Sequence, residues 1–138
     1  MNLFLDSSAL AKRYIADEES ERIDALLASA DSMGVLVLAF PEIVSALNRR
    51  RREGRLSPVA YRKAKGALEA DLEEATVLQL TGEVLDRAVI LLERHPLRSS
   101  DALHVAAAAA WRADRFVSAD ARQCAAARGM GLAVVELR

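Results

Sequence analysis

The chain has 138 residues and a formal net charge of −1, and its composition is 52% hydrophobic and 28% charged. This length predicts one domain over residues 1–138, and the composition predicts a folded chain rather than a disordered one. The near-neutral charge excludes a wholly basic, histone-like protein, and the single cysteine, Cys124, excludes a disulfide framework or a cysteine-based zinc cluster.

The sequence carries no sign of a membrane segment. No apolar run approaches the ~20 residues of a membrane span. Residues 1–6 have no basic segment and reach an acid after three apolar residues, unlike a signal peptide. We therefore expect a cytoplasmic protein with no membrane partner.

Five short runs rich in valine, leucine and phenylalanine predict strands. Each run is almost continuously apolar rather than alternating, which is typical of strands that helices cover on both faces. The runs are Leu3–Leu5, Val35–Leu38, Val77–Leu80, Phe116–Val117 and Ala133–Val135.

Helical segments lie between these runs, and capping residues mark several of their ends. They are a short helix after Asp6, Ser20–Ala30, a helix that Pro41 opens and Gly54 ends, one from Ser57-Pro58 to about Leu72, one that Thr81 caps, one that Ser99 or Ser100 caps and that reaches Ala113, and Ala121–Arg128. The resulting order, β-α-α-β-α-α-β-α-α-β-α-β, predicts the α/β class. We expect a mostly parallel central sheet of about five strands with helices on both faces.

Four acidic residues fall at the ends of these predicted elements. Asp6 directly follows the first strand, and Glu42 lies in the first turn of the helix after the second. Asp101 lies in the first turn of the alanine-rich helix, and Asp120 follows the fourth strand. Ligand sites of open α/β sheets form outside the carboxyl ends of the strands. At least three of these acids are therefore expected at one such site.

Each acid also has a simpler interpretation, because Asp and Glu in a first turn bind free backbone N–H groups and complement the helix dipole. Their joint placement favours a site. Two carboxylates at ~4 Å repel by about 4 kcal/mol at an effective dielectric near 20, so a cluster persists only with protons or cations. Oxygen ligands without cysteine favour Mg²⁺ or Mn²⁺, ions that assist phosphodiester hydrolysis.

Four segments in order resemble a PIN-domain ribonuclease, most closely the VapC toxins of type II toxin–antitoxin systems. They are Leu3–Leu10, Pro41–Leu47, Ser100–Ala108 and Phe116–Asp120, the last followed by an alanine-rich helix and a final strand. Each segment alone is a weak signal, but their order and spacing cover essentially the whole chain. The resemblance implies a PIN-like fold.

The resemblance also implies an Mg²⁺- or Mn²⁺-dependent endoribonuclease that acts on RNA, a homodimer, and a cognate antitoxin that covers the active site. It assigns the metal and catalytic site to Asp6, Glu42, Asp101 and Asp120. Supporting hydroxyls map to Ser7, Ser8 and Ser118. We expect Asp6 and Asp101 to be direct metal ligands, while Glu42 and Asp120 complete the site by binding a second ion or by orienting the attacking water.

A strongly basic segment follows the second acid. Residues 48–66 contain eight basic residues and one acid, Glu53, in a chain whose total charge is −1. The simple interpretation is a solvated helical hairpin. The alternative is a surface for RNA or a protein partner, formed by Arg49, Arg50, Arg51, Arg52 and Arg55. Successive helical residues advance by about 100°, so four consecutive arginines must point in different directions.

Other residues leave alternatives open. His104 shares a helix face with Asp101 and could hydrogen-bond near the site, but a lone histidine there favours a structural role. An aspartate-nucleophile phosphatase fits an acid after the first strand, although Ser8 stands where one large phosphatase group has a second acid. A non-catalytic RNA- or partner-binding module, in which the acids only cap helices, is the third possibility.

Overall fold

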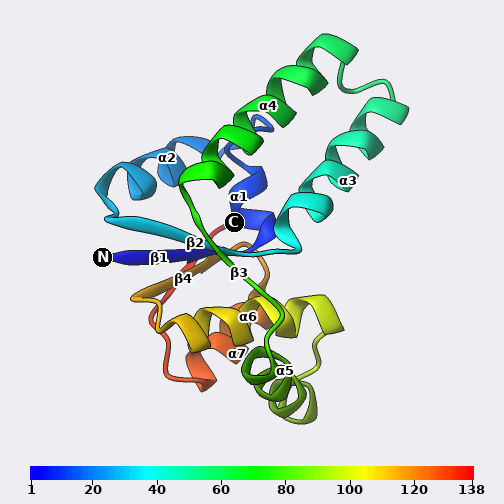
Figure 1. The fold of residues 1–138 in the computed structure, drawn as a ribbon. Helices are drawn as coiled ribbons and strands as arrows, with labels where there is room; N and C mark the ends of the chain where they lie inside the picture. Colours follow the sequence, from blue (N-terminus) through cyan, green and yellow to red (C-terminus); the bar gives the residue numbers. More distant parts are fainter.

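The computed structural model describes residues 1–138 and contains the twelve elements in the predicted order (Figure 1). The strands are β1 (Asn2–Leu5), β2 (Ser32–Leu36), β3 (Thr76–Leu78), β4 (Arg115–Ser118) and β5 (Val134–Glu136). The helices are α1 (Ser7–Ala11), α2 (Ser20–Ser29), α3 (Ala39–Arg52), α4 (Pro58–Glu74), α5 (Gly82–Arg94), α6 (Ser99–Trp111) and α7 (Ala121–Gly129). None of these helices is long and apolar enough to cross a membrane.

The five strands form one sheet in the order β3-β2-β1-β4-β5, and every neighbouring pair is parallel. The prediction of a parallel five-stranded sheet is therefore confirmed. In the central strand, Phe4 is paired with Gly34 of β2 and with Phe116 of β4. The chain builds outward from β1 to β3, then returns to the other side of β1 with β4. This reversal opens a crevice at the carboxyl ends of β1 and β4, where open α/β sheets bind ligands.

Helices cover both faces of the sheet, as predicted (Figure 1). Successive strand residues point to opposite faces, so the buried side chains divide between two cores. Leu3 and Leu5 pack with α1 to α4, whereas Phe4 packs with α5 to α7. The change of face follows from the reversal in strand order, because parallel crossovers keep the right-handed sense.

The second strand differs from the predicted Val35–Leu38, since it begins at Ser32 and ends at Leu36. Glycine is uncommon in strands, so the sequence pattern did not predict that the strand includes Gly34. The glycine has a packing reason here: a Cβ atom on Gly34 would lie 2.5 Å from the ring of Trp111. The strand therefore passes close under an aromatic ring from α6.

Two helix starts also differ from the prediction. The third helix begins at Ala39, so Pro41 lies inside its first turn, where a missing N–H costs nothing. The sixth begins at Ser99, and neither serine caps it, because Arg98 is the N-cap residue and forms no side-chain cap. The sixth helix ends at Trp111 rather than Ala113, since Arg112 adopts a left-handed conformation with φ of 59°.

Other helix ends follow the expected chemistry. The Ser57 and Thr81 hydroxyls accept the backbone N–H groups of Ala60 and Val84, at 3.1 and 3.2 Å. Gly54, with φ of 72°, follows α3 as predicted, and the N–H of Arg55 reaches back to the carbonyl of Arg50 at 2.8 Å. This closure lets α3 turn into α4. The two helices form a hairpin whose far end projects away from the sheet (Figure 1).

Candidate active site

A cavity of about 330 Å³ lies at the crevice beyond β1 and β4. All four acids that the sequence singles out line it, although they come from four separate parts of the chain. They are Asp6, Glu42, Asp101 and Asp120. The wall also includes Ser7, Ser8, Arg49, Arg98, His104 and Gln123. The structure thus places the acids together, which capping preferences alone would not require.

Asp6 is deeply buried, with 3% of its surface exposed. It caps α1 by accepting the backbone N–H of Ala9 at 2.9 Å, while the hydroxyls of Ser8 and Ser118 donate to Oδ2 at 2.8 and 2.9 Å. Burial raises the pKa of the Asp6 carboxyl above its usual value, despite these hydrogen bonds and the charge of His104. A buried carboxylate without a cation is therefore costly in the metal-free protein.

Glu42 lies in the first turn of α3, and its Oε1 atom is the hydrogen-bond partner of two side chains. Ser7 Oγ donates to Oε1 at 2.9 Å, and His104 Nε2 lies 2.6 Å from the same atom. Burial raises the pKa of Glu42, but the hydrogen bond and charge of His104 and the hydrogen bond of Ser7 outweigh it. The net pKa lies below the usual 4.5, so Glu42 is ionised at neutral pH.

Asp101 lies in the first turn of α6, with a side chain that is 15% exposed. Its Oδ2 is 3.2 Å from Nε of Arg98, whose side chain is 85% exposed. An ion pair with a partner this exposed contributes little stability, on the order of 1 kcal/mol or less. The backbone carbonyl of Asp101 accepts the amide of Gln123 at 3.1 Å, which ties the start of α6 to α7.

Asp120 caps α7. Its Oδ1 accepts the backbone N–H groups of Arg122 and Gln123 at 2.8 and 3.2 Å, which leaves Oδ2 without a backbone donor. The capping interpretation is therefore correct for Asp6 and Asp120, yet both residues also line the cavity. Capping and a ligand role are compatible because a carboxylate has two oxygens and about four lone-pair sites.

Buried hydroxyl and amide groups connect the acids. Ser118 Oγ lies 2.9 Å from Oδ2 of Asp6 and 3.0 Å from Oε1 of Gln123, and it accepts the N–H of Asp120 at 3.0 Å. Gln123 is 1% exposed. The positions predicted for supporting hydroxyls thus bind two of the acids directly, through Ser8 and Ser118 at Asp6 and Ser7 at Glu42.

Sequence reasoning missed two polar residues of this cavity, Arg98 and Gln123, and favoured a structural role for a third, His104. Arg98 and Gln123 drew no notice, although each lies three positions from a cavity acid. His104 is buried and hydrogen-bonded, as a structural histidine would be, but its partner is the cavity residue Glu42. The spacing of three between Asp101 and His104 already predicted that both lie on one face of α6, but it did not show that Glu42 is the partner.

The arginines of the basic segment contact different parts of the protein. Arg49 lines the acidic cavity, and Arg50 lines the adjoining hollow beside Lys12. The guanidinium of Arg51 lies 5.1 Å from the centre of the Tyr61 ring, in cation–π geometry across the α3–α4 hairpin.

The remaining two arginines lie farther along the chain. Arg52 is exposed, and Arg55 forms an exposed pair with Glu53 at 3.6 Å. Of the five arginines, Arg49 thus lines the cavity and Arg50 lines the hollow beside it.

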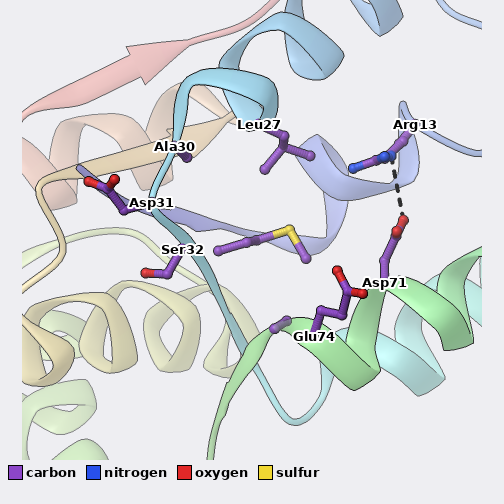
Figure 2. A pocket seen from close by; sticks show the side chains of 9 residues that line it. Arg13, Leu27, Ala30, Asp31, Ser32, Asp71 and Glu74 are labelled. Carbon is purple, nitrogen blue, oxygen red and sulfur yellow. Dashed lines mark ion pairs between the residues drawn. The ribbon is translucent and has the colours of Figure 1, made fainter.

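A second acid-lined pocket lies between α2, β2 and α4 (Figure 2). Two of its three acids, Asp31 and Asp71, have cations of the protein itself as partners. Arg13, in the turn after α1, pairs with Asp71 of α4 at 3.4 Å, and the N-terminal ammonium pairs with Asp31. The charge of this pocket is largely balanced internally, in contrast to the cavity beyond β1 and β4.

Comparison with known proteins identifies the family. Residues 3–129 match the model of the PIN domain family. Ribonuclease VapC3 from Pyrobaculum aerophilum is 32% identical over 110 residues, which is 78% of this chain and 82% of that protein. The chain therefore belongs to the PIN-domain family, and within it to the VapC group.

Solved structures share the fold. VapC20 from Mycobacterium tuberculosis, described as a toxin that cleaves the sarcin–ricin loop, superposes with a TM-score of 0.72 at 23% identity, covering 99% of this chain and 98% of that one. A toxin–antitoxin complex from Klebsiella pneumoniae gives 0.70 at 16% identity, with 98% and 99% covered. The resemblance that the sequence motifs suggest is confirmed.

The donors of the cavity suit a hard divalent ion. They are carboxylate oxygens, and the one histidine already has its Nε2 directed at Glu42. No group of three or more His, Cys, Asp or Glu side chains is placed to hold a metal ion together in a protein cage. Mg²⁺ needs no such cage, because it keeps several waters and is held by one or two carboxylates. The residues therefore fit Mg²⁺ or Mn²⁺ in an open site.

In the metal-free protein, Asp6→Asn should raise the free energy of unfolding at pH 7. Because burial raises the folded-state pKa of Asp6 above the usual 3.8, the folded protein holds a proton that the unfolded chain has lost between these values. Wild-type stability therefore falls as pH rises through this interval, and the deficit persists at neutral pH. Asparagine has no proton to lose and keeps an oxygen for the cap.

The measurement is urea unfolding of both proteins in EDTA at several pH values from 4 to 8. The stability advantage of the variant should grow with pH above about 4 and then level off. A variant less stable than wild type at pH 7 would contradict the inferred cost of the buried charge.

Proposed function

We propose that this protein is a divalent-metal-dependent endoribonuclease and the toxin of a toxin–antitoxin pair. The supporting observation is that four carboxylates from four elements line one cavity at the reversal point of the sheet, in a chain of the VapC group. RNA is the substrate, and Mg²⁺ or Mn²⁺ is the cofactor. A toxin that cleaves cellular RNA acts in the cytoplasm, which is the location we propose.

The four acids have two different roles in this proposal. Asp6 and Asp101 would hold the ion, and Glu42 and Asp120 would complete the site, either as ligands of a second ion or by orienting the attacking water. The Ser8 hydroxyl lies close to both carboxylate oxygens of Asp6, but it has one hydrogen and can donate to only one of them at a time. A lone pair of the Asp6 carboxylate therefore remains for a ligand. When bound, the ion supplies a water of lowered pKa and offsets charge on the phosphate. The hydroxyls of Ser7, Ser8 and Ser118 hold the acids in place.

Asp101→Asn should reduce RNA cleavage by at least 100-fold while the protein stays folded, because the amide cannot replace a charged metal ligand. The matched control is Asp86→Asn, which changes an exposed acid of α5 away from the cavity and should cleave RNA at the wild-type rate. The assay is cleavage of total RNA and of mapped oligonucleotides with Mg²⁺, with Mn²⁺ and with EDTA.

Cleavage that persists in EDTA would argue against metal dependence. Trapping of a phosphate analogue on Asp6 would favour the phosphatase alternative. A wild-type protein that binds RNA but neither binds Mn²⁺ nor cleaves would favour the non-catalytic binding module.

RNA capture requires positive charge beside the acids, since the acids alone repel phosphates. We propose that Arg49 and Arg50 bind phosphates next to the scissile one, because they line the cavity and its neighbour. Arg51, Arg52 and Arg55 line neither hollow and are the candidates for contact with the antitoxin, which we expect to cover the site.

Arg49→Ala should weaken RNA binding several-fold and reduce the slope of log affinity against log salt by about 0.7, the value for one lost phosphate contact on a single strand. Arg52→Ala is the control with the same loss of charge, and it should change the slope by clearly less. Binding is measured in EDTA to prevent cleavage. Equal slopes for the two variants would contradict the assignment of Arg49.

Helix α5 supplies the best surface for a homodimer. Its inner face packs against α6, while Leu85, Val89 and Leu92 lie on the outer side with 46%, 54% and 39% of their surface exposed. These positions follow i, i+4 and i+7 spacing, so they share one stripe of the helix. Exposed apolar stripes of this kind mark interaction sites. We propose that two copies of the chain pair through α5.

Val89→Lys should convert the dimer to a monomer, because a lysine charge would be buried at the centre of the apolar stripe. Val59→Lys changes an apolar residue of α4 that is 68% exposed, outside this surface, and should leave the dimer intact. Light scattering after size exclusion measures the mass. A Val89→Lys protein that remains dimeric would rule out the α5 interface.

A further inference from the structure

His104 is buried in the wall of the acidic cavity, with 2% of its surface exposed. Its Nε2 lies 2.6 Å from Oε1 of Glu42 and 3.3 Å from Oγ of Ser7. Ser7 Oγ also donates to Oε1 of Glu42 at 2.9 Å. The three side chains come from α6, α3 and α1, so they link three helices at the mouth of the crevice.

The bond to Glu42 determines which ring nitrogen of His104 carries a hydrogen. An ionised carboxylate accepts hydrogen bonds and cannot donate them, so Nε2 must carry the hydrogen in the bond to Glu42. The other ring nitrogen, Nδ1, is buried and has no hydrogen-bond partner.

Core packing does not account for this histidine. Its direct neighbours on α6, Leu103 and Val105, are apolar, and an apolar side chain at this position would leave no buried nitrogen unpaired. The bond to Glu42 is the one polar contact at 3.0 Å or less that the ring makes, and it runs to an acid of the cavity. The ring therefore acts on Glu42 rather than on the fold in general.

We propose that His104 is a positioning residue, which holds Oε1 of Glu42 through Nε2, together with Ser7, so that Oε2 is available to the metal ion. This inference rests on the proposed metal-dependent function, and it adds a residue that the acidic motifs do not include. Partners that orient a metal-binding carboxylate have large effects, with losses of about 10- to 100-fold in metal affinity or activity when they are removed.

The test compares two replacements of His104. Glutamine carries its amide N–H₂ near the position of Nε2 and can still donate to Glu42, whereas leucine has a similar size and no donor. Because glutamine does not titrate, it separates orientation from proton transfer. His95→Gln, at the far end of α5, is the control for loss of a histidine elsewhere.

Mn²⁺ affinity is measured by titration calorimetry without RNA, and kcat and KM are measured on an RNA oligonucleotide with saturating Mn²⁺. His104→Leu should bind Mn²⁺ about 10- to 100-fold more weakly and show a lower kcat with KM for RNA little changed, because the arginines bind the RNA. His104→Gln and His95→Gln should stay close to wild type in Mn²⁺ affinity. If His104→Leu does not fold, His104→Met replaces it, since methionine adapts to irregular core space.

Wild-type Mn²⁺ affinity in a folded His104→Leu or His104→Met protein would overturn the inference, and so would a folded His104→Gln protein as weak as the apolar variant. If the wild type binds Mn²⁺ but cuts no RNA, the proposed function fails, while the order of Mn²⁺ affinities still decides the role of His104. A wild type that binds no Mn²⁺ would overturn both.

Discussion

The structure depends on one electrostatic constraint: negatively charged side chains converge where the parallel sheet reverses its order. Parallel strands end at the same edge, and β1 and β4 are neighbours although more than a hundred residues separate them in the chain. Asp6 and Asp120 follow these strands, and the first turns of α3 and α6 bring Glu42 and Asp101 to the same cavity. Such a cluster is repulsive, so the protein must supply hydrogen bonds and leave room for a cation.

The protein offsets this repulsion only in part. Asp6 accepts bonds from a backbone N–H and two hydroxyls, yet burial still raises the pKa of its carboxyl. Glu42 is held by His104 and Ser7, and Arg98 pairs with Asp101 at the exposed rim. By contrast, the pocket of Figure 2 pairs Asp71 with Arg13 and Asp31 with the N-terminal ammonium. The incomplete balance distinguishes this cavity from a surface ion-pair network and supports the proposed cation site.

Local sequence signals predicted the order of elements, the parallel sheet and the position of the four acids at one cavity. Strand runs, caps and acid positions are properties of short segments, so they can be recognised in the sequence. The start of β2 was missed, because glycine is a poor strand residue. The reason for a glycine at position 34 is the ring of Trp111, which packs against it and comes from a distant part of the chain. The pairing of His104 with Glu42 was missed for a different reason. These residues are 62 positions apart, and their contact depends on how α3 and α6 cross the edge of the sheet. Interactions of that kind follow from packing, which single-sequence patterns do not encode.

The most direct test of the converging acids is Mn²⁺ titration followed by paramagnetic broadening of backbone amide signals in NMR spectra. The account predicts that signals of residues beside Asp6, Glu42, Asp101 and Asp120 broaden first and together, because one site serves all four. Asp101→Asn should weaken this broadening throughout the set. Broadening centred instead on Asp31, Asp71 and Glu74, or none at millimolar Mn²⁺, would contradict the account.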